Sequence, residues 1–182
     1  ALLFLGSGSV IHAMSGEQDM RKMGALWNKI PITAKTFLIA AIAISGIPPL
    51  AGFFSKDAIL GAAFEGHRLL WVLGLITAGM TAFYMFRLVY MTFFGESRVP
   101  HDVEHHIHES PASMTVPLMI LAGLSVVGGW IGWPAALGGS DRFARFLEPV
   151  IVHHAEAAEA VPEAGHLGLE WGLMLLSVAV AV

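Results

Sequence analysis

The 182-residue chain is 55% hydrophobic and 13% charged, about half the charged fraction of a typical soluble domain, with a net charge of −4. It contains no cysteine, which excludes disulfides, thiolate iron–sulfur ligation and CxxC redox chemistry, and no basic cluster points to nucleic acid. Apolar runs of about 20 residues, long enough to cross a bilayer, alternate with polar stretches. The sequence therefore predicts an all-α, polytopic transmembrane helical bundle.

Six membrane segments are predicted in a single membrane domain, with three polar loops between them. The first and last segments are too short to cross a bilayer alone, so we expect a fragment of a longer chain. The segments cover about residues 1–13, 32–47, 50–64, 69–94, 113–136 and 168–182, and the loops are 14–31, 95–112 and 137–167.

The apolar stretch 32–64 is too long for one simple crossing, and Pro48-Pro49 interrupts it. Proline removes a backbone donor and clashes with the preceding turn, so we expect one span before the prolines and a second, interrupted one after them. If every segment crosses, residues 14–31, 65–68 and 137–166 share one side of the membrane. Their excess of Lys and Arg predicts that this side is cytoplasmic.

Lys56 directly follows twenty uncharged residues, 36–55, and a lysine at bilayer depth costs roughly 2.5–3.5 kcal/mol. One interpretation is an interfacial anchor beside Asp57, with the lysine reaching to the headgroups. The other places Lys56 in a discontinuous helix facing a hydrated cavity, where a buried lysine can exchange protons near neutral pH. Composition alone leaves both open.

Three further residue types within the apolar segments are candidate functional residues. His12 is either a histidine at a helix end near the headgroups or part of a proton relay with Ser7 and Ser9. Arg87 is expected to hold a carboxylate or a helix terminus in a neighbouring segment.

A histidine-rich stretch follows the fourth segment. Its i, i+3 and i+4 spacings would suit zinc, but a solvent loop without a companion cluster is a weak signal, so no metal site is predicted. Its minor candidates are His101, His105, His106 and His108.

Two motifs together resemble a known family. They are LFLGSGSVIHA at residues 3–13 and GIPPLAGFFSKD at residues 46–57, and YMFR at 84–87 and HESP at 108–111 also fit. These stretches are similar to the large antiporter-like subunit of proton-pumping NADH:quinone oxidoreductase (respiratory complex I), called subunit L or chain 5. The resemblance covers essentially the whole chain and implies the C-terminal half of the subunit.

The resemblance implies a proton-translocating subunit in which protons pass through buried lysine, histidine and water, with energy from quinone reduction elsewhere in the complex. Lys56 would be the lysine of the broken helix on the exit side, and His12 a polar link to a central lysine upstream of Ala1. Supporting roles fall to Ser7, Ser9, Asp57 and Arg87. The family fold also implies a periplasmic 137–166 loop, opposite to the charge count.

By the same resemblance, the chain carries no redox chemistry and no cofactor, because NAD, FMN, iron–sulfur clusters and quinone belong to other subunits. The expected partners are membrane-arm subunits and lipid in a bacterial inner membrane, without nucleic acid or direct NADH binding. Three alternatives remain: the large subunit of a multisubunit Na⁺/H⁺ antiporter, a structural membrane scaffold, and a metal permease that uses the histidine loop.

Overall fold

The computed structural model describes residues 1–132, 146, 172–173, 175–176 and 178–179. Every element in this part of the chain is helical, so the predicted all-α bundle is confirmed there. The 137–167 loop, apart from residue 146, lies outside the described residues, as do the end of the predicted segment 113–136 and much of the segment 168–182.

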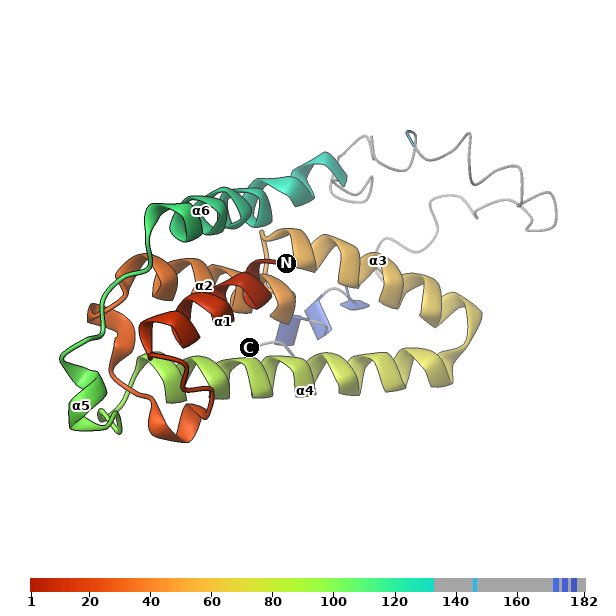
Figure 1. Cartoon of the computed structure of the whole chain (residues 1–182). Helices are drawn as coiled ribbons and strands as arrows, with labels where there is room; N and C mark the ends of the chain where they lie inside the picture. The colour runs from red at the N-terminus through yellow and green to blue at the C-terminus, as the bar shows by residue number, and fades with distance from the viewer. Residues whose placement is uncertain (133–145, 147–171, 174, 177, 180–182) are drawn as a thin grey trace.

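Five longer helices form the described bundle (Figure 1). Helix α2 lies at its centre and packs against all four of the others. Small, fully buried residues such as Ala34 and Ala41 let the neighbouring helices approach it closely. The helices are α1 (Leu2–Ala13), α2 (Pro31–Ser45), α3 (Ala51–Gly66), α4 (Arg68–Phe93) and α6 (Ala112–Val127).

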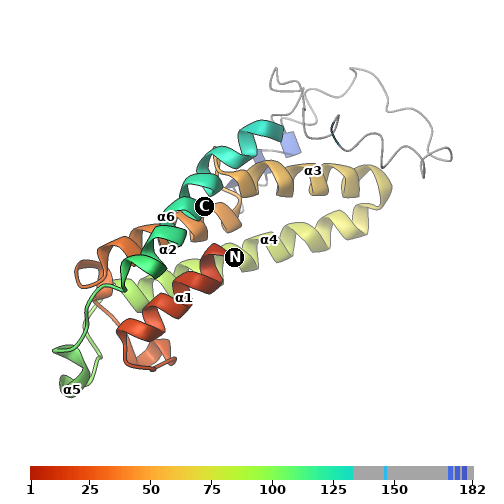
Figure 2. The ribbon, with the colours of Figure 1, turned by 45° about the horizontal axis from the view of Figure 1, so that its top comes forward.

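Helices α2 and α3 follow one another in the chain and are separated by a break at the prolines. Gly46, with a φ of 85°, ends α2 in the left-handed conformation, and the chain turns through Pro48-Pro49, a cis bond, before α3 begins. The 26-residue helix α4 packs against both halves, which succeed one another along it (Figures 1 and 2). The break therefore lies where the prolines predict it, and the expectation of two separate spans stays a prediction.

The arrangement of the helices also bears on which connections share one side of the membrane. Residues 14–30 and 94–111 lie together at one end of the bundle, called here the loop end, and the turn between α3 and α4 lies at the other end (Figure 1). Residues 14–31 and 65–68, which were predicted to share one side of the membrane, lie at opposite ends of the described bundle.

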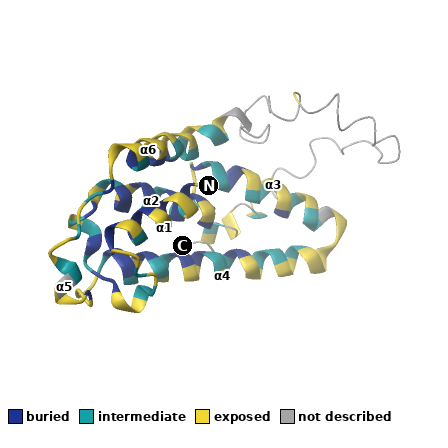
Figure 3. Ribbon diagram, in the orientation of Figure 1, coloured by how far each residue is buried: buried dark blue, intermediate teal, exposed yellow. Residues whose placement is uncertain are grey.

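Two described helices are long and apolar enough to cross a membrane by length and composition. One is α4, and the other is α6 together with the first residues of the 3₁₀-helix η3 (Gly128–Gly132), over Ala112–Trp130. Both of these helices carry exposed residues along most of their length (Figure 3). Helices α1 and α2 are shorter apolar helices.

The loop end is a folded cap. The α1–α2 connection contains two short 3₁₀-helices, η1 (Met20–Lys22) and η2 (Leu26–Asn28), and its Leu26 is fully buried. The α4–α6 connection contains the short helix α5 (His101–Glu104). Arg98 ties the two connections together, because its guanidinium donates to the carbonyl oxygens of Met23 at 2.9 Å and Met91 at 2.6 Å.

Candidate functional site

Lys56 lies at the joint between the two half-helices. Its half-buried side chain turns back from the second turn of α3 toward the end of α2. There its Nζ donates hydrogen bonds to the carbonyl oxygens of Ile44 and Ser45, both at 3.0 Å. These carbonyls belong to the last turn of α2, where no intrahelical donor is available and the helix dipole places partial negative charge. The ammonium group therefore caps α2.

The joint is closely packed. A Cβ atom on Gly46 would lie 3.1 Å from Cδ of Lys56, so the lysine stem runs directly over this glycine. A Cβ on Gly52 would overlap the carbonyl of Ala43, which means that the first turn of α3 touches the backbone of α2. From the other side, the indole of Trp130 donates to the carbonyl of Pro49 at 3.3 Å. Glycine at positions 46 and 52 is what allows this geometry.

A second polar cluster lies between α1, α2 and the start of α6 at the loop end. The fully buried Ser9 hydroxyl lies 2.8 Å from the Thr33 hydroxyl and donates to the Ser110 hydroxyl at 2.7 Å. The Thr33 hydroxyl donates to Oε1 of Glu109 at 2.6 Å. Helices α1 and α2 and the connection before α6 are thus joined by a continuous chain of side-chain oxygens, which satisfies hydroxyl groups that would otherwise be costly to bury.

Glu109 also caps the N-terminus of α2. Its Oε2 accepts from the backbone amides of Ile32 at 2.7 Å and Thr33 at 3.4 Å. First-turn amides lack intrahelical acceptors, and a carboxylate suits the positive end of the helix dipole. The sequence indicated Glu109 only as a weak metal-site candidate beside the histidines, and it did not single out Thr33 or Ser110. A cap supplied from 77 residues away leaves no local sequence signal.

The other predicted site residues are spread over the bundle. His12, exposed in the last turn of α1, has its ring 6.2 Å from that of His108. Ser9 joins the loop-end cluster, but Ser7 faces a different region, a groove described below. Asp57 follows Lys56 and is half-buried. Arg87 is exposed on α4 and lines the same groove as Ser7.

The structure does not bring Lys56 and His12 into one hydrogen-bonded group. Lys56 contacts residue 45 of α2, whereas Ser9, one turn before His12, contacts residue 33. Twelve helical residues separate these two levels, about 18 Å at 1.5 Å per residue. A proton passing between them would have to travel through water or other side chains.

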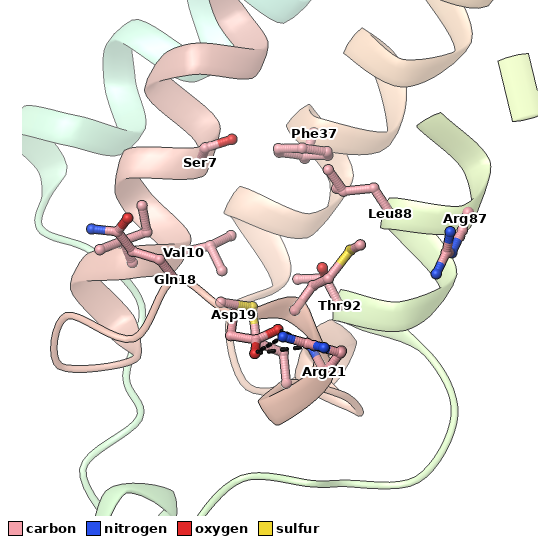
Figure 4. A pocket seen from close by; sticks show the side chains of 12 residues that line it. Ser7, Val10, Gln18, Asp19, Arg21, Phe37, Arg87, Leu88 and Thr92 are labelled. Carbon is pink, nitrogen blue, oxygen red and sulfur yellow. Dashed lines mark hydrogen bonds and ion pairs between the residues drawn. The ribbon is translucent and has the colours of Figure 1, made fainter. Parts of the chain in front are cut away.

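A groove of about 520 Å³ opens between α1 and α4 (Figure 4). Both helices pack mainly on α2, whose Phe37 forms the floor, and residues 18–21 and 23 close the loop end. At that end, Arg21 and Asp19 form an ion pair at 3.0 Å. The hydrogen bond from the Arg21 guanidinium holds the pKa of Asp19 below its usual range.

The histidine-rich loop is held mainly by a lysine–glutamate pair. Lys29 Nζ lies 2.7 Å from Oε1 of Glu104, and this hydrogen bond lowers the pKa of the Glu104 carboxyl. His101 and His105 are exposed, and His101 Nδ1 is 3.9 Å from Oε2 of Glu104. Among the described residues, no three His, Asp or Glu side chains come together as possible metal ligands.

A discontinuous membrane helix is typical of membrane transporters, and the comparisons point to an antiporter-like membrane subunit. Residues 1–81 match the transmembrane family described as NADH:quinone oxidoreductase/Mrp antiporter. The chain is 49% identical to NADH-quinone oxidoreductase subunit L of Mycobacterium tuberculosis, covering 98% of this chain and 28% of the relative. It is 44% identical to NAD(P)H-quinone oxidoreductase chain 5 of Picosynechococcus, covering 100% of this chain and 31% of the relative.

The subunit L of Rhodobacter capsulatus is 43% identical over 86% of this chain and 24% of the relative. The chain belongs to the family of NADH-quinone oxidoreductase subunit L, also called chain 5. It spans about a third or less of the length of these relatives. The family named from the sequence motifs is therefore confirmed.

Proposed function

We propose that this chain is part of a proton-translocating membrane subunit of an NADH:quinone oxidoreductase in a bacterial inner membrane, and that Lys56 carries protons in it. The observation that carries the proposal is the position of the Lys56 ammonium at a break in a membrane helix. In the described part of the chain, its Nζ makes two hydrogen bonds to backbone carbonyls and no ion pair.

This environment supports reversible protonation. The charged ammonium is favoured by the negative end of α2, an effect of about 0.3–1 kcal/mol at exposed helix ends and up to about 2 kcal/mol when partly buried. Backbone carbonyls accept hydrogen bonds but do not take up the proton, so a released proton leaves through water or another side chain. Losing the proton removes the charge that holds α3 against the end of α2. Protonation of Lys56 is thereby linked to how firmly α3 is held against the end of α2.

The loop-end cluster supplies a second set of protonatable groups. His12 and His108 lie near the membrane-flanking connection, next to the Glu109–Thr33–Ser9 hydrogen bonds. We assign His12 to the relay, with Ser9 supporting it on the preceding turn of α1. Asp57 supports Lys56 at the joint. Ser7 and Arg87 are further supports that face the groove.

The energy source lies outside this chain. The names of the relatives identify them as oxidoreductase subunits, and the chain has no cysteine to ligate an iron–sulfur cluster. Redox cofactors (NAD, FMN, iron–sulfur clusters) and quinone are assigned to other subunits of the complex. The partners of this chain are the other membrane-arm subunits and lipid, and quinone reduction reaches Lys56 through conformational and electrostatic coupling.

The test replaces Lys56 by alanine in the full-length subunit of an assembled complex. Proton pumping into membrane vesicles and coupled quinone reductase activity are measured together. We expect pumping to fall strongly in Lys56→Ala and also in Lys56→Arg, because arginine keeps the charge but does not release the proton. Lys35→Ala, at an exposed lysine on α2, is the matched control and should pump normally. Normal pumping by an assembled Lys56→Ala complex would refute the proposal.

The matched family is also named for Mrp antiporters, which keeps Na⁺/H⁺ exchange as a second candidate. The relatives compared here favour the oxidoreductase, because they are oxidoreductase subunits by name. Proton movement driven by a Na⁺ gradient, with no requirement for NADH, would support the antiporter instead.

A further inference from the structure

The exposed face of α4 carries a regular stripe. Large side chains recur at alternating spacings of four and three residues, and all of them are exposed. They are Leu69, Leu73, Ile76, Met80, Phe83, Arg87 and Tyr90. A repeat that averages 3.5 residues is the seam along which one helix packs against another, with each side chain inserting between residues of the neighbour. Most membrane helix pairs pack in this left-handed way.

Arg87 is the one charged residue in this stripe, and it lies six residues before the end of α4 at Phe93, about 9 Å along the axis. Side chains on a helix tilt toward its N-terminus, so Arg87 leans away from the nearer membrane surface. In the described part of the chain, the guanidinium makes no hydrogen bond and no ion pair. An arginine facing lipid at this depth would be costly, which favours a protein partner.

The groove meets the stripe at Arg87. Leu88 and Thr92 on α4 form one wall and Ser7 and Val10 on α1 the other, over the ring of Phe37 (Figure 4). A trough between two helices, floored by a third, has the shape that receives a further helix. Arg21 is neutralised by Asp19, so Arg87 is the uncompensated charge of this groove.

We propose that the stripe on α4 and the adjoining groove seat a transmembrane helix from the same subunit, outside residues 1–182, and that an Asp or Glu on that helix pairs with Arg87. The occupant follows from two observations. First, the positive charge of Arg87 in the groove requires an anionic partner. Second, the relatives are about three times as long as this chain, so a subunit of that length has further helices that must pack against a surface such as this one. The inference concerns assembly and does not depend on proton transfer.

The experiment reverses the charge and then restores complementarity. In the full-length subunit within the complex, we expect Arg87→Glu to lower the amount of assembled subunit by about tenfold or more, since it opposes two carboxylates in a site of low dielectric. Arg68→Glu, at the exposed far end of the same helix, should assemble normally. If Arg87→Glu assembles like the unchanged subunit, the proposal is overturned.

Loss of assembly alone would also follow from a merely structural role, so a second arm is needed. Each Asp and Glu in the other membrane helices of the subunit is changed to Arg in the Arg87→Glu background. Restored assembly by one such change, and by few or none of the others, identifies the pairing residue and supports the proposal. Restoration by none overturns it, and an anionic lipid that co-purifies only when Arg87 is present would then identify a lipid phosphate as the occupant.

Discussion

Replacing Glu109 by alanine should loosen the start of α2 and the helices that meet there. The carboxylate accepts from the Thr33 hydroxyl at 2.6 Å and from the Ile32 amide at 2.7 Å. A hydrogen bond to a charged group contributes about 1.5–3 kcal/mol. Because Glu109 is only half-buried, water replaces part of this loss, and we expect a net local cost of about 2 kcal/mol.

The assay is hydrogen exchange of the Ile32 and Thr33 amides in the assembled complex, measured by mass spectrometry. A loss of about 2 kcal/mol corresponds to exchange that is about 30-fold faster. Glu109→Gln should fall between Glu109→Ala and the unchanged chain, because one oxygen acceptor remains. Glu96→Ala, an exposed residue of the same connection, is the control. Unchanged exchange at both amides in Glu109→Ala would refute the capping role.

Two further predictions concern backbone contact at the joint and the pH dependence of the loop end. Gly52→Ala should lower the free energy of unfolding in thermal denaturation of the complex by about 1–3 kcal/mol, since its Cβ would overlap the Ala43 carbonyl. Gly61→Ala, with open space around it, is the control and should be neutral or slightly stabilising. The pKa of Glu104 lies below its usual 4.5 because of the Lys29 hydrogen bond, so the pair stabilises the loop above that pH and the contribution disappears as pH falls through the lowered value. Limited proteolysis of residues 95–111 across pH should show this loss, and Glu104→Gln should remove it.

Much of the helix layout could be predicted from the sequence, because its signals are local. Apolar runs mark α1, α4 and α6, and Pro48-Pro49 marks the break. The count of crossings has no such local signal, since two half-helices and two short spans have the same composition. Only the length of α4, which packs against both halves, distinguishes them.

The functional residues divide in the same way. Lys56 was found because a lysine after a long uncharged run is unusual in a membrane segment. Its acceptors are backbone carbonyls, which no side-chain motif records. The capping role of Glu109 was missed because its amides and hydroxyl lie about 77 residues earlier in the chain, so this role depends on tertiary packing.

Helix α2 is held at both ends by side chains from other helices or connections. Glu109 accepts hydrogen bonds from its first amides, and Lys56 donates hydrogen bonds to its last carbonyls. A regular α-helix of 15 residues joins the two sites. Such a helix is stiff along its axis, because stretching it would break its own hydrogen bonds. It therefore moves along its axis as a rigid element about 22 Å long. An axial slide that releases Glu109 must also displace the carbonyls that receive Lys56, which couples the loop end to the helix joint through a single helix.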